Sequence, residues 1–198
     1  RLSAAIVGTG NIAGGNNAKR RDGEAGVYTH AGAYAEHGEF FLKTVCELDG
    51  KRAEEFCRAW KVESAVGSLA GICGGFHDVI SVCTPDHTHF GIVRDILIAG
   101  CCRTVFIEKP LATELGQIEE LIRLAEEKNI RLVVNFQRRN EPLHREIRER
   151  IESGPGDLLS ATGCYMKGLR HIGVTLIDTL SYLCGYPQAV LAYNRILN

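Results

Sequence analysis

The chain has 198 residues, 45% of them hydrophobic, and a formal net charge of -1. This length can bury a sizeable core, and it predicts one complete domain with part of another. The balanced charge argues against a nucleic-acid partner, because dedicated nucleic-acid binders usually carry a basic excess. No apolar run approaches the roughly 20 residues that cross a bilayer, so we expect no membrane partner either.

The eight cysteines are not spaced like a disulfide scaffold, and no C-x-x-C pair occurs. Cys46, Cys83 and Cys164 lie in strand-like apolar runs, which is typical of reduced, buried thiols in a cytoplasmic protein. His87 and His89 could form a metal pair, but no third and fourth ligand follows at a suitable spacing. The sequence therefore predicts a cytoplasmic protein without a metal site.

A short apolar strand, Leu2 to Val7, runs directly into the turn Gly8-Thr9-Gly10-Asn11-Ile12-Ala13. In a G-x-G-x-x-A turn the first glycine permits the tight turn, and the second lets the backbone approach a pyrophosphate. The small Ala13 lets the following helix pack closely on the strand, and the pyrophosphate lies on N–H groups at the helix start. The position of this turn after an amino-terminal strand predicts a dinucleotide site.

The next stretch, Gly14 to Tyr28, is rich in glycine, asparagine and charge, which indicates an insertion or a frayed helix before a helical piece from His30 to His37. A second strand, Phe41 to Glu47, follows and ends in an acid. We expect the Glu47 carboxylate to bind the adenosine ribose and to repel a 2′-phosphate, so NAD is favoured over NADP. Two alternatives remain open: Glu47 is a solvated strand end, or the basic cluster Lys19-Arg20-Arg21 offsets its charge.

Strand and helix patterns then alternate up to Asn135. In chain order they are a helix over Asp49–Trp60, a strand over Asp78–Thr84, a helix over His89–Ala99, a strand over Val105–Glu108, a helix after Thr113 and a strand over Arg131–Val134. This alternation predicts an α/β fold, with a Rossmann-type doubly wound parallel sheet over residues 1–136.

The apolar run Val105-Phe106-Ile107 ends abruptly in Glu108-Lys109-Pro110. Proline cannot continue a central ladder, so Pro110 takes the chain out of the sheet directly after Lys109. Ligands bind at the carboxyl ends of the strands in open α/β sheets, and a partly buried lysine there suits acid/base chemistry. The alternative is an ordinary surface lysine after a strand.

The pattern changes in residues 137–198. A helix is predicted from Pro142 to Gly154, followed by a strand over Leu158–Met166. After a second helix, the apolar segment Tyr186–Leu197 begins as a strand without a partner. These residues therefore predict the beginning of an incomplete α+β second domain, which is either truncated or completed by another chain.

The second helix of this part runs from about Gly168 to Cys184. His171, Thr175 and Asp178 are spaced i, i+4 and i+7, so they share one face of a regular helix. The alternative for this polar stripe is a solvated helix face.

Three motifs occur together in a fixed order: Gly8 to Ala13, Cys83-Thr84-Pro85 with His89, and Glu108-Lys109-Pro110. In this combination the chain resembles the Gfo/Idh/MocA oxidoreductases, the family of glucose–fructose oxidoreductase and inositol dehydrogenase. The resemblance implies a Rossmann domain for NAD(P) and an α+β domain whose sheet covers the substrate and builds a homo-oligomer interface. It also implies hydride transfer between the nicotinamide and a hydroxyl or ketone carbon of a sugar- or cyclitol-like substrate.

The resemblance and the residue patterns together predict two groups of site residues. The candidate catalytic residues are Lys109, His171, Thr175 and Asp178. The candidate cofactor-binding residues are Gly8, Gly10, Asn11, Ile12, Glu47, Thr84, Pro85, His89, Glu108 and Lys109.

The chain departs from the family in the helix motif D-x-G-x-H-x-x-D, where the first aspartate is His171 and the acid/base histidine is Thr175. Threonine cannot take up a proton near neutral pH, so the usual base is absent. Three interpretations follow. Lys109 carries the proton transfer alone, His171 substitutes from one helical turn away, or the protein is a dinucleotide-binding sensor without turnover.

Overall fold

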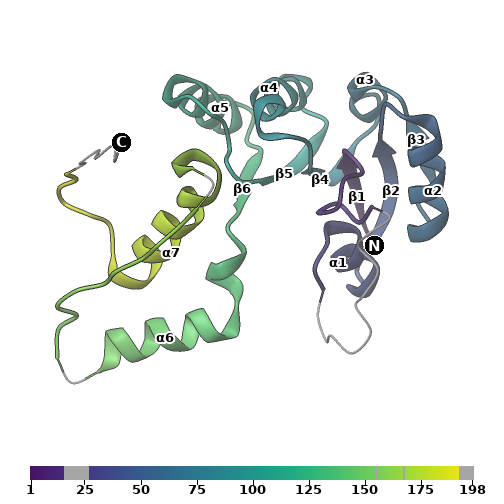
Figure 1. Ribbon diagram of the computed structural model, residues 1–198. Coiled ribbons are helices and arrows are strands. Elements are labelled where there is room, and N and C mark those ends of the chain that lie inside the picture. The colour runs from purple at the N-terminus through teal and green to yellow at the C-terminus, as the bar shows by residue number, and fades with distance from the viewer. Residues whose placement is uncertain (16–26, 155, 167, 192–198) are drawn as a thin grey trace, which may run out of the picture. The chain divides into compact units, whose positions relative to one another are not determined.

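A computed structural model describes residues 1–15, 27–154, 156–166 and 168–191, without the side chains of Arg170 and His171. The chain divides into two compact units, Arg1–Asn135 and Phe136–Asn198, each with its own helices (Figure 1). Among the described residues, no helix is both long and apolar enough to span a membrane.

The first unit is built on a six-stranded parallel sheet in the order β3-β2-β1-β4-β5-β6. The strands are β1 (Leu2–Val7), β2 (Phe40–Cys46), β3 (Ser64–Val66), β4 (His77–Val82), β5 (Cys102–Glu108) and β6 (Arg131–Asn135). The strand order reverses direction at β1, which confirms the predicted Rossmann-type doubly wound fold. Strand β3 was not predicted, because its three residues carry too little periodicity.

Helices cover both faces of this sheet (Figure 1). They are α1 (His30–Glu36), α2 (Gly50–Trp60), α3 (Leu69–Cys73), α4 (His89–Ala99) and α5 (Leu115–Glu127). Tyr34 of α1 and Phe56 of α2 belong to the core on one face. Ile72, Ile96 and Leu121 anchor α3, α4 and α5 in the core on the other face. The central strand β1 is therefore buried from both sides, which explains its continuous apolar run.

Local sequence explains where two of these helices begin and end. The Asp49 carboxylate accepts hydrogen bonds of 2.9 and 3.2 Å from the N–H groups of Lys51 and Arg52, which caps the start of α2. Gly100 follows α4 with a φ of 63°, a conformation that glycine adopts without strain. The start of α2 and the end of α4 match the helix limits expected from the periodicity.

Helix α1 starts directly on the end of the glycine turn. The His30 N–H donates to Ile12 O at 3.1 Å, and the Ala31 N–H donates to Ala13 O at 2.9 Å. The predicted insertion lies between these two partners in sequence, and its residues 16–26, including the cluster Lys19-Arg20-Arg21, lie outside the described residues. These two backbone hydrogen bonds tie the start of α1 to the glycine turn.

The regular secondary structure in the described part of the second unit is helical. It contains η2 (Gln137–Asn140), α6 (Pro142–Ser153), a π-helical turn (Leu169–Gly173) and α7 (Val174–Cys184). Helix α6 begins at the predicted proline, whose missing N–H needs no partner in the first turn. The sequence predicts a single helix from about Gly168 to Cys184. The structure has the π-helical turn in the first part of this range and α7 in the rest.

The predicted strand over Leu158–Met166 is wrong, because these residues have no regular secondary structure. Tyr186–Leu191 is not a strand either, and the remainder of that predicted segment lies outside the described residues. A strand needs a neighbour to pair its backbone groups, and the described part of this unit contains none. The sheet through which a homo-oligomer was expected is therefore missing from the described residues of the second unit.

Candidate functional site

The carboxyl edge of the sheet carries most of the predicted site residues of the first unit. Strands β1, β4 and β5 are neighbours, so the loops that follow them leave the sheet at the same edge. These loops begin at Gly8, Cys83 and Lys109. The strand order reverses between β1 and β4, and ligands of open α/β sheets bind at such a point.

Gly8 and Gly10 of the first loop differ in what requires a glycine at each position. Gly8 has a φ of +88°, and a Cβ there would lie 2.9 Å from Thr84 Cγ2 and 3.1 Å from Cys83 O. Folding alone therefore requires glycine at this position. At Gly10, whose φ is not positive, a Cβ would meet only Cys83 O at 4.0 Å among the described residues. Packing does not explain Gly10, so this position fits the close approach of a ligand to the backbone.

Asn11 and Ile12 complete the turn. The Asn11 side chain is exposed, whereas Ile12 is half-buried and packs against the core beneath α1. Among the described residues, no acceptor occurs for the backbone N–H groups of Gly10, Asn11 and Ile12. Successive N–H groups at the start of a helical turn favour an anion such as a pyrophosphate.

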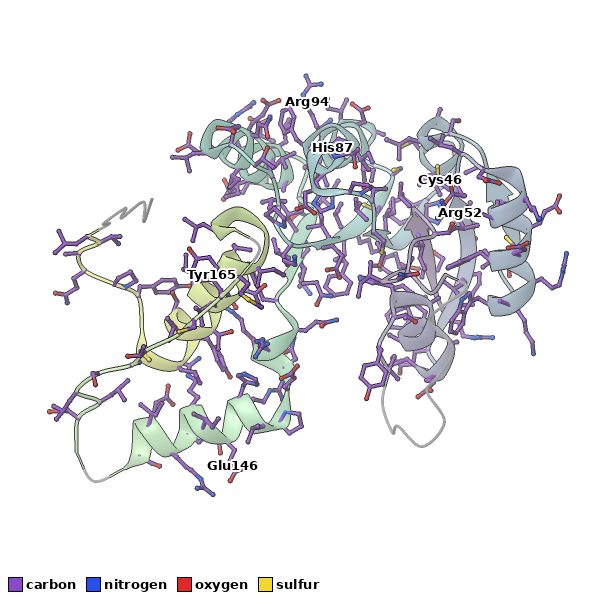
Figure 2. The ribbon with its side chains drawn as sticks, in the orientation of Figure 1. Cys46, Arg52, His87, Arg94, Glu146 and Tyr165 are labelled. Carbon is purple, nitrogen blue, oxygen red and sulfur yellow. The ribbon has the colours of Figure 1, made fainter. Side chains whose placement is uncertain are left out.

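Glu47 follows β2 and reaches back to the glycine turn. Its Oε2 accepts hydrogen bonds from the Thr9 hydroxyl and from the Thr9 N–H, the latter at 3.1 Å. Arg52 of α2, labelled in Figure 2, lies 3.5 Å from the same oxygen. Burial raises the pKa of Glu47, but the hydrogen bonds from Thr9 and Asp49 and the Arg52 charge outweigh it, so the pKa is lowered. Glu47 is therefore an ionised carboxylate beside the glycine turn.

The loop after β4 holds Thr84 and Pro85. The Thr84 hydroxyl accepts a 2.7 Å hydrogen bond from the Thr88 hydroxyl, and its methyl group fills the space that glycine leaves at position 8. Pro85 is exposed and precedes the short 3-10 turn η1 (Asp86–Thr88). This loop thus packs directly on the glycine turn, as the sheet order requires.

His89 is the first residue of α4, and the structure places it differently from the predicted cofactor contact. Its side chain is fully buried. Nδ1 lies 2.6 Å from Pro110 O, and Nε2 lies 2.9 Å from Thr84 O. A ring without exposed surface offers nothing to a ligand, so His89 instead links the loops that follow β4 and β5.

Glu108 is also engaged within the protein. Its Oε1 lies 2.9 Å from His30 Nε2 and accepts a 2.6 Å hydrogen bond from Asn135 Nδ2. His30 Nδ1 lies 3.0 Å from the Ser81 hydroxyl, which the Tyr34 hydroxyl approaches at 2.8 Å. This buried network joins β5 to α1, β4 and β6, and it holds the carboxylate that the sequence assigned to the cofactor.

Four members of this network were not predicted from the sequence: His30, Tyr34, Ser81 and Asn135. One signal was available, because Ser81 is a hydroxyl inside the apolar run of β4. A polar side chain in a strand that is buried on both faces has to find a hydrogen-bond partner. The identity of that partner could not be read, since His30 is 51 residues away in the chain.

The network predicts a specific acid dependence of stability. Burial raises the pKa of Glu108, but the hydrogen bonds from His30 and Asn135 and the Lys109 charge outweigh it, so the pKa is lowered. A carboxyl group with a lowered folded-state pKa stabilises the fold above its unfolded value of about 4.3, and this contribution is lost as the pH falls through the folded value. We expect Glu108→Gln to lower the free energy of unfolding at about pH 6 and to flatten its decline below about pH 4.3.

Urea unfolding at a series of pH values measures both effects. Glu119→Gln, an exposed position on α5, is the matched control and should leave the pH profile unchanged. The same acid limb in Glu108→Gln and in the parent protein would contradict the assigned ionisation of Glu108.

Lys109 directly follows β5 and is half-buried. The strand ends at Glu108, in agreement with the break that Pro110 predicts, and the Lys109–Pro110 peptide bond is cis. Through Pro110 O and His89, the backbone beside Lys109 is connected to Thr84 in the neighbouring loop. Lys109 therefore lies at the edge of the sheet where the sequence placed it.

Asp178, a predicted catalytic residue of the second unit, forms an ion pair. Its side chain is buried, and Arg139 Nε donates to both carboxylate oxygens at 2.9 and 3.0 Å. Arg139 Nη2 adds a 2.5 Å bond to Oδ1, and the guanidinium lies 5.8 Å from the centre of the Tyr182 ring. Asp178 thus ties α7 to η2 and is not a free acid or base in this structure.

Thr175 and His171 differ in how far they are described. Thr175 is half-buried on α7, and its carbonyl accepts a 2.8 Å hydrogen bond from the Thr179 hydroxyl. His171 belongs to the π-helical turn, and its side chain lies outside the described residues. Because π-helical hydrogen bonds join residues five apart, the α-helical face predicted for these residues does not continue unchanged to His171.

The ion pair between Arg139 and Asp178 is expected to stabilise the second unit. Arg139→Ala leaves the buried Asp178 carboxylate without its donors, which should cost about 1–3 kcal/mol. The expected result is faster amide hydrogen exchange across α7, measured by mass spectrometry. Arg150→Ala is the control, because its pair with Glu146 joins side chains that are 78% and 54% exposed and should contribute less than about 1 kcal/mol. Equal exchange in the two variants would contradict the structural role.

A metal site and an apolar groove are two alternatives to the carboxyl edge. The described residues contain no group of three or more His, Cys, Asp or Glu side chains that could hold a metal ion. A groove of about 800 Å³ runs along α5 and β6, with Leu111, Ile122, Ile130 and Val134 in its lining. The groove contains none of the predicted site residues, so the carboxyl edge remains the candidate site of the first unit.

Comparison with known proteins agrees with this geometry. The inositol 2-dehydrogenase of Rhizobium meliloti is 26% identical over 129 residues, which cover 63% of this chain and 37% of that protein. The D-glucoside 3-dehydrogenase of Escherichia coli is 25% identical over 207 residues, which cover 94% of this chain and 55% of that protein. The chain therefore spans only about half, or less, of the length of these relatives.

A solved structure shares the fold. The WlbA dehydrogenase from Bordetella pertussis, in complex with NADH and UDP-GlcNAcA, matches with a TM-score of 0.73 at 20% identity. The match covers 93% of this chain and 59% of that chain. Residues 2–136 match the family model described as "Oxidoreductase family, NAD-binding Rossmann fold", which is more than half of the chain. The chain belongs to the Gfo/Idh/MocA family of oxidoreductases.

Proposed function

We propose that the protein is an NAD(P)-dependent oxidoreductase. It moves a hydride between the nicotinamide and a hydroxyl or ketone carbon of a sugar- or cyclitol-like substrate. The observation that carries this function is the carboxyl edge, where Lys109 follows β5 and the glycine turn follows β1. The substrate class rests on relatives that are named for inositol and D-glucoside.

The residues of the edge favour NAD over NADP. The N–H groups of Gly10 and Asn11 would hold the pyrophosphate, and the absence of a side chain at Gly10 leaves room for it. Glu47, ionised beside this turn, would accept hydrogen bonds from the ribose hydroxyls and repel a 2′-phosphate. Arg52, the nearby cation, already lies 3.5 Å from Glu47. NAD, when bound, supplies the hydride acceptor.

Lys109 supplies the proton chemistry. Oxidation of a CH–OH carbon removes a hydride from carbon and a proton from oxygen, and reduction returns both. The Lys109 amine would accept the hydroxyl proton during oxidation and, as the ammonium, return it during reduction. Its position after β5 supports this role, because groups at the carboxyl ends of the strands face the ligand in open α/β sheets.

Reduced-nicotinamide absorbance, followed with a panel of inositols and glucosides and with both NAD and NADP, tests the proposal. The expected result is turnover that is faster with NAD than with NADP. A melting temperature that rises with NADH, without turnover of any panel member, would count against the enzyme. A melting temperature unchanged by either cofactor would contradict the proposed dinucleotide site, since a ligand that binds the native state stabilises the folded protein.

The second candidate is a dinucleotide-binding sensor without catalysis. Two observations favour it: Thr175 occupies the position of the family's acid/base histidine, and Asp178 is bound by Arg139. A sensor needs the glycine turn and Glu47 but no proton-transfer group. The melting-temperature rise without turnover described above is its signature.

Thr175→His separates the two candidates further. An imidazole titrates near neutral pH, so we expect this variant to turn over substrate at least about tenfold faster than the parent protein. A sensor predicts activity in the variant and none in the parent. Thr179→His, one helical turn later on α7, is the control and should add nothing. Unchanged turnover in Thr175→His would show that position 175 does not take part in proton transfer.

A further inference from the structure

The two edges of the parallel sheet differ in how they are protected. The edge strand β3 has only three residues. The opposite edge strand, β6, has five, and among the described residues of the first unit it pairs only with β5 (Figure 1). Proteins commonly protect the unpaired N–H and C=O groups of an edge with proline, lysine, a bulge or a very short strand. β6 has neither proline nor lysine, its register with β5 is unbroken, and its one charged residue, Arg131, is at its first position.

The groove of about 800 Å³ lies beside this edge. Leu132 and Val134 of β6 line it together with Ile122 and Ala125 of α5. The Ile122 side chain is 45% exposed, and Val133, on the opposite face of β6, is 36% exposed. Polar and charged residues complete the lining, among them Glu126, Asn129 and Arg131. An apolar centre with polar residues around it is typical of a protein–protein contact.

The order of residues in β6 is complementary to itself in the antiparallel direction. A polar residue stands at each end, and three apolar residues stand between them: Arg131-Leu132-Val133-Val134-Asn135. In two copies paired antiparallel about Val133, this residue faces its equivalent, Leu132 faces Val134, and Arg131 faces Asn135. Each apolar residue then faces an apolar one, and no like charges face each other. The next register that keeps both α5 helices on one side of the sheet would put Arg131 opposite Val133.

The polar residues at the two ends of β6 also suit each other. Asn135 Nδ2 donates to Glu108 Oε1 at 2.6 Å, which leaves the side-chain oxygen of Asn135 as an acceptor. The Arg131 side chain has no hydrogen-bond or ion-pair partner among the described residues. A guanidinium donates hydrogen bonds only, so Arg131 of one copy is a suitable donor to Asn135 of the other.

We propose that the outer edge of β6 and the groove beside it form the contact surface for a second copy of this chain. The two β6 strands pair antiparallel about Val133, so that one continuous sheet runs through both copies. A two-fold axis lets the same surface serve in each copy, and the outward N–H and C=O groups of both strands gain partners. This surface differs from the second-domain sheet that the family resemblance implies for oligomers, and it does not rest on the proposed function.

Sedimentation equilibrium of the full chain tests this contact. We expect a concentration-dependent dimer of the parent protein. Val133→Lys and Val133→Glu each place like charges opposite each other at the two-fold axis, so each variant alone should raise the dimer dissociation constant at least about tenfold. A mixture of the two variants should regain the dimer, because a lysine then faces a glutamate.

Recovery in the mixture distinguishes a lost contact from a lost fold, since unfolded chains would not regain a dimer on mixing. Leu115→Lys is the matched control, because Leu115 is an exposed apolar residue of α5 that does not line the groove, and this variant should remain dimeric. A monomeric parent protein, or a dimer that both Val133 variants retain, would overturn the proposal. Two folded variants that stay monomeric in the mixture would overturn it as well.

Hydrogen exchange of the parent protein tests the same contact without any substitution. The outward amides of β6 should exchange at least about tenfold more slowly in concentrated than in dilute protein, because the dimer pairs them. The amides of β3, the other edge strand, are the internal comparison and should exchange equally at both concentrations. Equal exchange of β6 at both concentrations would refute the proposal, even for a protein that dimerises through another surface. Neither measurement needs cofactor or substrate, so both are independent of the proposed function.

Discussion

Replacing Lys109 with methionine is expected to lower turnover by about 10²–10⁴-fold while leaving the affinity for NADH nearly unchanged. Methionine keeps much of the length and apolar surface of lysine but cannot exchange a proton. Lys109 follows β5 at the carboxyl edge, whereas the residues proposed to hold the dinucleotide belong to the loops after β1 and β2. A proton-transfer role therefore predicts a loss in kcat with little change in the dissociation constant of NADH.

Steady-state kinetics and a titration of the protein with NADH, followed by fluorescence, measure the two quantities separately. Lys128→Met, an exposed lysine at the end of α5, is the matched control and should change neither. A weakened NADH affinity with unchanged kcat would assign Lys109 to cofactor binding instead. Full activity in Lys109→Met would remove the proposed role altogether.

Gly10→Val is expected to weaken NADH binding by more than about tenfold, equivalent to about 1.4 kcal/mol, without a comparable loss of stability. A Cβ at this position would meet only Cys83 O at 4.0 Å among the described residues, so their packing leaves room for it. The added side chain would instead occupy the space in which a pyrophosphate approaches the backbone. Calorimetric titration with NADH and urea unfolding measure the two effects.

Gly8→Val is the comparison that makes this result specific. Gly8 has a φ of +88°, and its Cβ would lie 2.9 Å from Thr84 Cγ2, so this variant should be destabilised by more than about 1–2 kcal/mol. The substitution of Gly10 should thus weaken NADH binding, whereas the substitution of Gly8 should lower the stability. Equal destabilisation at both positions would show that Gly10 is required by folding and would withdraw its assignment to the cofactor.

The fold could be predicted because its signals are local. The apolar runs of β1, β4 and β5 alternate with helical periodicity, and strand–helix alternation has few compact solutions other than a doubly wound parallel sheet. Pro110 marks the end of β5, and Gly8 marks the tight turn after β1. Each of these signals lies within the element that it defines.

The second unit shows where local signals fail. Leu158–Met166 has the apolar composition of a strand, but a strand is stable only when neighbouring backbone pairs with it. The π-helical turn over Leu169–Gly173 also escaped prediction, because it changes the hydrogen-bond pattern without changing the residue types. Asp178 was predicted to be catalytic from its helical spacing and the family motif, and its ion pair with Arg139 could not be foreseen because Arg139 lies 39 residues away in the chain.

The sequence by itself determined the fold class, the family and the three loops that meet at the carboxyl edge, because motifs and periodicity are written in neighbouring residues. Only the tertiary structure decided which side chains at that edge are available to a ligand. It shows Glu108 bound to His30, a partner 78 residues away, and His89 buried between two carbonyl groups. Such pairings depend on strand order and helix packing, and no stretch of sequence contains both partners. Among the described residues, Gly10 remains a position whose side-chain space packing does not use.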